Sequence, residues 1–250
     1  MTGQPDEGWV RAARTGAVLT VSLVRPDQLN AQTPATWAAL RAIGEGLHDD
    51  VRVVVVRGEG RAFSAGLDRE ALPVVAAELA PLRVDVAEER IRGWQAAFRW
   101  LRSPGVVSVA AVQGHAVGAG AQLALACDLR VVAEDLQLRL PEATLGLVPD
   151  LTGTSALVEL VGYSRAVELC LTGRAVGAAE AVALGLATTA VPADRLDAAV
   201  ADLVTALLAA DAGASREVLA LLRSAGRSAP EAQDASERAA QVRRLRTLGS

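Results

Sequence analysis

Apolar and polar positions follow two periods along the chain, one typical of strands and one typical of helices. Residues 9–24 predict a β-hairpin that turns at Thr15-Gly16, because the second arm alternates apolar and polar side chains. The run VRVVVVR at 51–57 is almost wholly apolar and β-branched, which is typical of a strand buried on both faces. Two further strands are expected over residues 106–112 and 129–132.

Segments whose apolar residues recur with the period of a helix lie between these strands. Pro34 stands at a first helical position and predicts a helix that runs toward residue 50. Further helices are expected over residues 87–101 and 121–128. The pattern at 73–83 is ambiguous and interrupted by proline, and a mobile loop is one interpretation of it. Strand, loop and helix alternate, so we expect an α/β core with crossover connections.

The second half of the chain changes character. From Ser155 onward the pattern is almost wholly helical, and three longer helical segments follow Pro192. We therefore divide the chain into a core over residues 1–191 and a helical C-terminal region over residues 192–250. The C-terminal helices are rich in Ala and Leu, and their amphipathic pattern requires a surface to cover.

Composition narrows the class of protein. Of the 250 residues, 51% are hydrophobic and 22% are charged, which is typical of a globular chain. Aromatic residues are only 3%, so the core has to be built from Ala, Val and Leu. Every basic residue is arginine, which excludes a Schiff-base lysine and the phosphate-binding lysine of a P-loop. The net charge of −4 indicates no general affinity for nucleic acid.

Cysteine usage and the chain start indicate a compartment. Cys127 and Cys170 each lie in an apolar helical pattern, so we expect buried thiols in a reducing compartment and no metal site. Residues 1–11 have neither the basic nor the apolar segment of a leader, and no apolar run approaches the ~18 residues that span a bilayer. We expect a cytoplasmic protein that does not bind membranes.

Two glycine-containing loops each follow a strand and precede a helix. The loop GRAFSAGLD does not fit a nucleophile elbow, because Ala62 stands two residues before Ser64. The loop QGHAVGAG does not fit a dinucleotide-binding motif, because Leu123 stands three residues after Gly120. Close packing and a site for an oxyanion both remain as interpretations. Two such junctions, each with a free backbone N–H, are the components of a two-donor hole.

The order of three segments resembles one family in particular. RPDQLNA, VRVVVVRGEGRAFSAGLD and AAVQGHAVGAGAQLALACDLRVVAEDLQLRLPEATLGLVPDLTG together resemble the crotonase superfamily of enoyl-CoA hydratases and isomerases over residues 10–192. The resemblance implies an α/β fold, a spiral of ββα units with a helical C-terminal trimerisation region, and a homotrimer or hexamer. It also implies an acyl-CoA substrate, no cofactor beyond the substrate's CoA thioester, and a pathway such as fatty-acid metabolism.

The resemblance also assigns residues of the site. The two backbone donors for the thioester oxygen fall on Leu67 and Ala119. Residues that match the CoA-binding positions, or that offer arginines to its phosphates, are Arg25, Ala65, Gly66, Leu67, Asp68, Arg69 and Gly118. For both arginines, a solvated surface charge is the alternative interpretation.

The acids of LPEATLGLVPDLTG are the candidates for proton transfer. Hydratases of this family use two glutamates; the second matches Glu142, but the first matches Gln122, which cannot titrate. Asp150 falls where dienoyl-CoA isomerases carry an acid. Glu142 could instead be a surface residue, and Asp150 a cap for the helix that follows.

These matches predict an isomerase that shifts a double bond in an enoyl- or dienoyl-CoA, with Glu142 as the principal acid and base and Asp150 as its partner. The first alternative is an enoyl-CoA hydratase, a lyase in which Gln122 or Asp150 contacts the water. The second is an acyl-CoA-binding protein with little catalysis, because an acid is missing at position 122.

Overall fold

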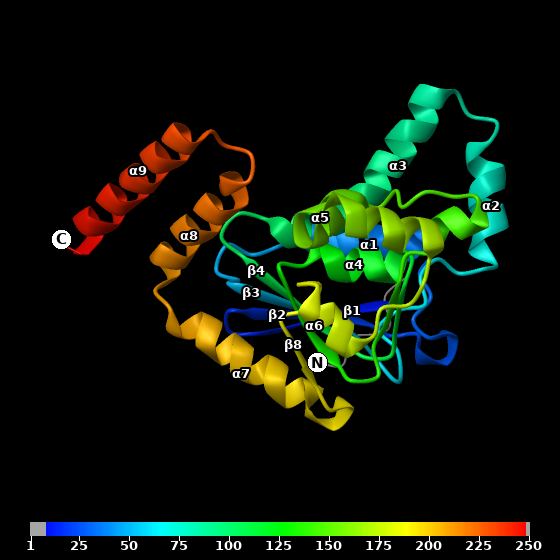
Figure 1. Cartoon of the computed structure of the whole chain (residues 1–250), viewed down its shortest axis with the longest axis horizontal. Helices are drawn as coiled ribbons and strands as arrows, with labels where there is room; N and C mark the ends of the chain where they lie inside the picture. Colours follow the sequence, from blue (N-terminus) through cyan, green and yellow to red (C-terminus); the bar gives the residue numbers. More distant parts are fainter. Residues whose placement is uncertain (1–8, 249–250) are drawn as a thin grey trace.

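A six-stranded sheet forms the centre of the protein (Figure 1). The structure is a computed structural model that describes residues 9–248; residues 1–8, which belong to the stretch without a leader pattern, and residues 249–250 lie outside it. The strand order is β1-β2-β3-β4-β6-β8, and all neighbours are parallel except the β1–β2 hairpin. The strands are β1 Val10–Thr15, β2 Val18–Leu23, β3 Val53–Gly58, β4 Val107–Val112, β6 Leu129–Ala133 and β8 Thr189–Val191. All but β8 were predicted from the sequence.

Both faces of strand β3, in the interior of the sheet, are buried, as the pattern at 51–57 predicted. In β3, Val54 and Val56 face one hydrophobic cluster, whereas Val53 and Val55 face another. The first cluster is covered by α1 Pro34–Glu45, α3 Val84–Arg99, α4 Ala119–Ala126 and α5 Gly153–Thr172. The second is covered by α7 Leu196–Ala209. The valines of β3 therefore pack against one cluster or the other, in alternation along the strand.

A second, two-stranded sheet carries the loops that matter for function. It pairs β5 His115–Val117 with β7 Gln137–Arg139 in parallel. QGHAVGAG was predicted to be a loop, and this is wrong for its middle part, because His115–Val117 forms strand β5. The successive units β4–β5–α4 and β6–β7–α5 repeat strand, strand and helix, which confirms the expected ββα arrangement.

The segment expected to be a mobile loop is mostly a helix. Helix α2 spans Ala71–Leu79, and with the N-terminal half of α3 it rises above one end of the sheet (Figure 1). Pro73 is the third residue of α2. A proline is tolerated there because N–H groups of the first turn have no partner inside the helix. The proline therefore marks a helix start and not a break.

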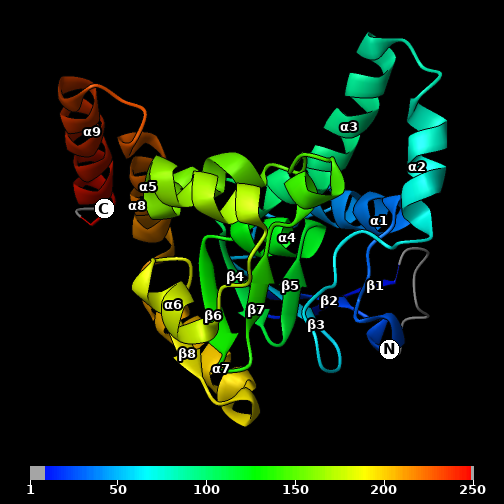
Figure 2. The same ribbon diagram turned by 45° about the vertical axis from the view of Figure 1, so that its right-hand side comes forward.

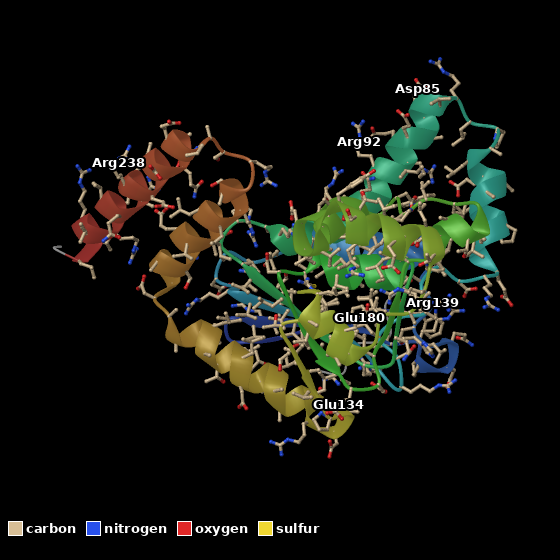
Figure 3. The ribbon with its side chains drawn as sticks, in the orientation of Figure 1. Asp85, Arg92, Glu134, Arg139, Glu180 and Arg238 are labelled. Atoms are coloured by element: carbon tan, nitrogen blue, oxygen red, sulfur yellow. The ribbon has the colours of Figure 1, made fainter. Side chains whose placement is uncertain are left out.

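The last helices extend away from the sheet. Helices α8 Ala212–Ala225 and α9 Pro230–Leu248 pack on each other at the side of the core, and Arg238 lies on α9 (Figures 2 and 3). Arg223 of α8 donates to both carboxylate oxygens of Asp128, which ties this hairpin to the core. The remaining elements are α6 Ala178–Ala183 and the 3-10 turns η1 Pro26–Gln28, η2 Trp100–Arg102, η3 Glu142–Leu145 and η4 Ala193–Arg195.

No single helix within residues 9–248 is long and apolar enough to cross a membrane. The segments Ala193–Ala209 and Ala212–Ala225 meet that criterion only when taken together, and they are bent by 104° at their junction. Both cysteines are free; Cys127 is fully buried as expected, whereas Cys170 is only half-buried.

Candidate active site

Two glycine loops that lie far apart in the sequence are in direct contact. Ser64 and Ala116 form a parallel bridge, and the Val117 N–H donates to the carbonyl oxygen of Ser64 at 3.0 Å. Gly66 has a φ of +87°, and a Cβ on it would lie 2.4 Å from the Val117 oxygen and 3.4 Å from the Ala119 nitrogen. Only glycine satisfies both the backbone angle and the close approach.

The contact leaves two backbone N–H groups unused. Neighbouring N–H groups are occupied: that of Asp68 donates to a carbonyl at 2.8 Å, and that of Gly118 donates to the carbonyl of Arg139, at the end of β7 (Figure 3), at 2.9 Å. The Leu67 N–H has no hydrogen-bond partner within residues 9–248. Ala119 is the first residue of α4, where an N–H has no partner inside the helix. The pair can hold one oxygen that gains negative charge.

Glu142 lies beside this pair of donors. Its Oε1 is 3.4 Å from the point where a Cβ on Gly118 would stand, and it accepts a hydrogen bond from Gln122 at 2.9 Å. Its Oε2 is buried and has no partner within residues 9–248. Burial raises the pKa of the Glu142 carboxyl above its ordinary value. Glu142 is therefore a buried acid, and the surface interpretation is wrong.

Asp150 is also near enough to influence Glu142. Burial raises the pKa of Asp150, and the charge of Asp150 in turn raises the pKa of Glu142. Helix α5 begins at Gly153 with Thr152 as its N-cap and no capping side chain. The interpretation of Asp150 as a helix cap is therefore wrong, because the helix begins three residues after it. Within residues 9–248, the Asp150 carboxylate accepts no hydrogen bond from another residue.

Asp150 also borders a groove of about 1340 Å³ between the core and α7–α8. Gln95 of α3 lines the same groove and donates to the Asp150 carbonyl at 2.8 Å. The Asp150 segment is thus held from α3, while the carboxyl group stays free of bonds to other residues. This leaves the acid available to a bound molecule.

The two arginines proposed for phosphate differ in their surroundings. Arg25 pairs with Asp68 and lies over the ring of Trp9, with its guanidinium carbon 5.9 Å from the ring centroid. Arg69 is exposed and forms no ion pair within the described part of the chain. Arg25 thus shapes the loop that follows Ala65, whereas Arg69 is free to move to an anion.

A scaffold of buried polar side chains supports the Leu67 loop, and the sequence pattern did not reveal it. Asn30 donates to the carbonyls of Glu59 and Ala62 at 2.8 Å each. Gln32 donates to the Ser64 hydroxyl at 3.0 Å, and that hydroxyl donates to the Asn30 carbonyl. Ser64 is fully buried, so it is not a nucleophile. The only signal was the polar run DQLNAQ, which resembles an ordinary surface loop.

Comparison with known proteins agrees with this geometry. A model of the enoyl-CoA hydratase/isomerase family matches residues 13–247. The probable enoyl-CoA hydratase echA8 of Mycobacterium tuberculosis is 33% identical over 178 residues, which are 70% of this chain and 66%, just under two thirds, of that protein. A probable enoyl-CoA hydratase of Rhizobium meliloti is 35% identical over 186 residues, 72% of this chain and 68% of that protein.

Solved structures agree over nearly the whole chain. A Thermobifida fusca YX chain in complex with acetoacetyl-CoA has a TM-score of 0.89 and 44% identity, covering 96% of this chain and 95% of that one. An enoyl-CoA hydratase from Polaromonas sp. JS666 has a TM-score of 0.86 and 29% identity, covering 94% and 91%. The fold and the paired donors define a crotonase-type protein. Within that class, the chain belongs to the enoyl-CoA hydratase/isomerase family and is an enzyme of that family.

Proposed function

We propose that the protein moves a carbon–carbon double bond in an enoyl- or dienoyl-CoA through a thioester enolate. One observation carries this proposal: within residues 9–248, the N–H groups of Leu67 and Ala119 are unused, and they adjoin a buried carboxyl that has one unpartnered oxygen. The donors stabilise negative charge on the thioester oxygen, and the carboxyl exchanges a proton with carbon. Both requirements of enolate chemistry thus meet in one place.

The reaction needs one proton to leave one carbon and one to arrive at another. The Glu142 carboxylate removes a proton from the carbon next to the double bond, and the electron pair moves onto the thioester oxygen held by Leu67 and Ala119. Protonated Glu142 returns that proton at the new position, which restores its carboxylate. Alternatively, Asp150 starts the cycle protonated and donates its proton at the new position, and the proton that Glu142 took then passes to Asp150, which restores both acids.

Burial of the two carboxyl groups favours proton transfer. Burial raises the pKa of Glu142 and of Asp150, which makes each carboxylate a stronger base than an exposed one. Catalysis by proton transfer is most effective when the pKa of the group approaches the working pH.

Support for a CoA thioester comes from the two glycine loops of the site and from the solved structures of similar proteins. The Thermobifida neighbour was solved with acetoacetyl-CoA, and it shares 44% of its residues with this chain. In the proposed complex, the segment Ala65–Asp68 and Gly118 contact the pantetheine part, and Arg25 and Arg69 face the phosphates. No cofactor beyond the CoA of the substrate takes part.

Hydration of 2-enoyl-CoA is the second candidate, because the curated relatives carry the name enoyl-CoA hydratase. The geometry favours it less. Hydration requires two groups to hold and activate a water, and Gln122 cannot titrate. Its carbonyl oxygen already accepts two backbone hydrogen bonds. Isomerisation needs no such second base at position 122.

A substrate panel separates the candidates. The protein is incubated with 2-enoyl-, 3-enoyl- and 3,5-dienoyl-CoA, with thioester absorbance and incorporation of ¹⁸O from water as readouts. Isomerisation shows as a change in absorbance without ¹⁸O uptake. Rapid ¹⁸O uptake from 2-enoyl-CoA without bond migration would establish the hydratase instead. Tight binding of all three esters without turnover would identify an acyl-CoA-binding protein.

We also propose a cytoplasmic homotrimer or hexamer. Apolar side chains of α8 and α9 are exposed in the single chain, among them Leu222, Leu245 and Leu248. A second copy would cover them, since exposed apolar surface of this kind is typical of interfaces. Analytical ultracentrifugation at several concentrations measures the assembly, and a monomer throughout would reject it.

A further inference from the structure

One buried amide next to Glu142 has no part in the proposed proton transfer. Gln122 lies on α4 and is 1% exposed. A fully buried amide of this kind needs a partner for each of its polar atoms. Its partners belong to two separate segments, the turn η3 that carries Glu142 and the start of α5.

The orientation of this amide is determined by its neighbours. Its Oε1 accepts hydrogen bonds from the backbone N–H groups of Leu151 at 2.8 Å and Gly153 at 3.2 Å. A backbone N–H can only donate, so the oxygen and not the nitrogen of Gln122 faces them. The NH₂ group therefore has to face Glu142. Gly153 permits the contact, since a Cβ there would lie 2.6 Å from the Gln122 Cγ.

This orientation makes the two oxygens of Glu142 unequal. Oε1 receives the Gln122 N–H at 2.9 Å, whereas Oε2 is buried without a partner in the described part of the chain. A carboxyl hydroxyl oxygen is a poorer acceptor than a carbonyl oxygen, so a proton on Oε1 would weaken the hydrogen bond that Gln122 donates there. A proton on Oε2 meets no such donor. Protonated Glu142 therefore has a carbonyl at Oε1 and a hydroxyl at Oε2.

We propose that Gln122 is a positioning residue that assigns the exchanged proton to Oε2 of Glu142 and holds the Asp150 segment beside it. The same amide binds Glu142 through its nitrogen and residues 151 and 153 through its oxygen, so one side chain spaces both acids. The inference rests on the proposed function only in stating that the Glu142 proton is exchanged with a substrate. Its test measures Glu142 in the free protein and does not need turnover. An acid at position 122 would keep the backbone bonds but lose the donor.

The test measures Glu142 in the free protein. Protein labelled with ¹³C at the glutamate carboxyl is titrated by NMR, and the Glu142 signal is identified by its loss in Glu142→Gln. Gln122→Leu removes the donor from a site that stays buried, so the pKa of Glu142 rises by about one unit. Gln122→Glu retains the bonds to residues 151 and 153 and adds a second carboxylate. It raises the pKa further, and the two acids titrate as a coupled pair.

Infrared spectroscopy locates the proton. At a pH where Glu142 is protonated, the carbonyl stretch at Oε1 is lowered by the Gln122 hydrogen bond, and it moves to higher frequency in Gln122→Leu. Gln113 provides a matched control, since it too is an amide that bonds to the backbone: its nitrogen donates to the carbonyls of Gly58 and Gly60, away from Glu142. Gln113→Leu leaves both the titration and the band of Glu142 unchanged.

An unchanged titration of Glu142 in both Gln122 variants, or an unmoved carbonyl band, overturns the proposal. Gln122→Glu guards against misfolding, because it keeps the bonds that hold the Asp150 segment. Shifts as expected without turnover of any enoyl-CoA would support the role of Gln122 in holding Glu142 and would reject the isomerase separately. If the protein turns over an enoyl-CoA, the acid limb of the pH profile of kcat moves to higher pH in the same order as the pKa of Glu142, from wild type to Gln122→Leu to Gln122→Glu. KM changes little.

Discussion

Replacing Gly66 by alanine tests the paired donors more directly than any change to an acid. The new Cβ would lie 2.4 Å from the Val117 oxygen, a distance that real Cβ atoms do not adopt, so one of the two loops must move. The added atom points toward the Ala119 nitrogen, 3.4 Å away. Separation of the loops therefore also separates the N–H groups of Leu67 and Ala119.

The magnitude has two parts. The backbone at Gly66 has a φ of +87°, and holding alanine in the left-handed region costs roughly 1–2 kcal/mol. Losing one donor of such a hole lowers kcat by about 10²–10³-fold, and a shift of about 1 Å is enough to cost about 10²-fold. We expect kcat/KM of Gly66→Ala to fall by roughly 10²-fold or more, with a loss of a few kcal/mol in the free energy of unfolding.

Gly16 supplies the matched control. It has a φ of +57° in the β1–β2 turn, and a Cβ there would meet no atom within 4 Å. Gly16→Ala thus has the same kind of backbone strain without the collision, and its kcat/KM should stay within about twofold of wild type, since the strain lies outside the site. Activity is measured on the best substrate of the panel, and stability by urea unfolding. Wild-type turnover by Gly66→Ala, or an equal loss in Gly16→Ala, would refute the reasoning.

Four further predictions concern the acids and the arginines. Glu142→Gln should lower kcat by about 10²–10⁴-fold while CoA-ester binding, measured by calorimetry, persists; unchanged turnover would remove Glu142 from its role. Burial raises the pKa of Glu142 in the folded protein. The stability contributed by the protonated form is therefore present below the ordinary pKa of glutamate and is lost as the pH rises through the raised pKa of the folded state. The loss is about 1.4 kcal/mol for each pH unit that separates the folded and unfolded pKa values. Urea unfolding across that window should therefore show wild type losing stability relative to Glu142→Gln, and parallel curves would contradict this. Asp150→Asn should slow double-bond migration by about tenfold or more without weakening ester binding, and an equal loss of binding would indicate a structural role. Arg69→Ala should raise KM for a CoA ester roughly tenfold and leave stability unchanged, whereas Arg25→Ala should also lower the free energy of unfolding, since its ion pair with Asp68 is largely buried. A pantetheine thioester, which lacks the nucleotide phosphates, is the control for both arginines, and equal effects on both esters would exclude a phosphate contact.

Local patterns predicted most of the core because their causes are local. The β-branched run of β3 has to be buried on both faces, and Pro34 has to open a helix rather than interrupt one. The same reasoning failed at Pro73, since a proline in a first turn and a proline in a loop have the same local sequence. The short strand β8 and the strands β5 and β7 were missed, because three residues are too few to show a period.

The candidate site likewise has residues that the sequence predicted and features that it could not predict. Motif order indicated the Leu67 and Ala119 donors and the acids Glu142 and Asp150. The pattern could not distinguish Asp150 as a cap from Asp150 as a free carboxyl, since that depended on where α5 begins. Nor could it show that Arg25 is engaged with Asp68 while Arg69 is free, because the partner lies 43 residues away.

Periodicity, motif order and the ability to titrate are properties of the unfolded chain, so they were enough to predict the α/β class, the family and the residue types available for chemistry. Tertiary structure alone decided which groups are left unsatisfied. Within residues 9–248, the Leu67 and Ala119 N–H groups and the Oε2 of Glu142 are free because the loops, β7 and Gln122 have taken the hydrogen bonds around them. Whether a polar atom is reactive depends on what it does not contact, and that is known only when the whole chain is folded.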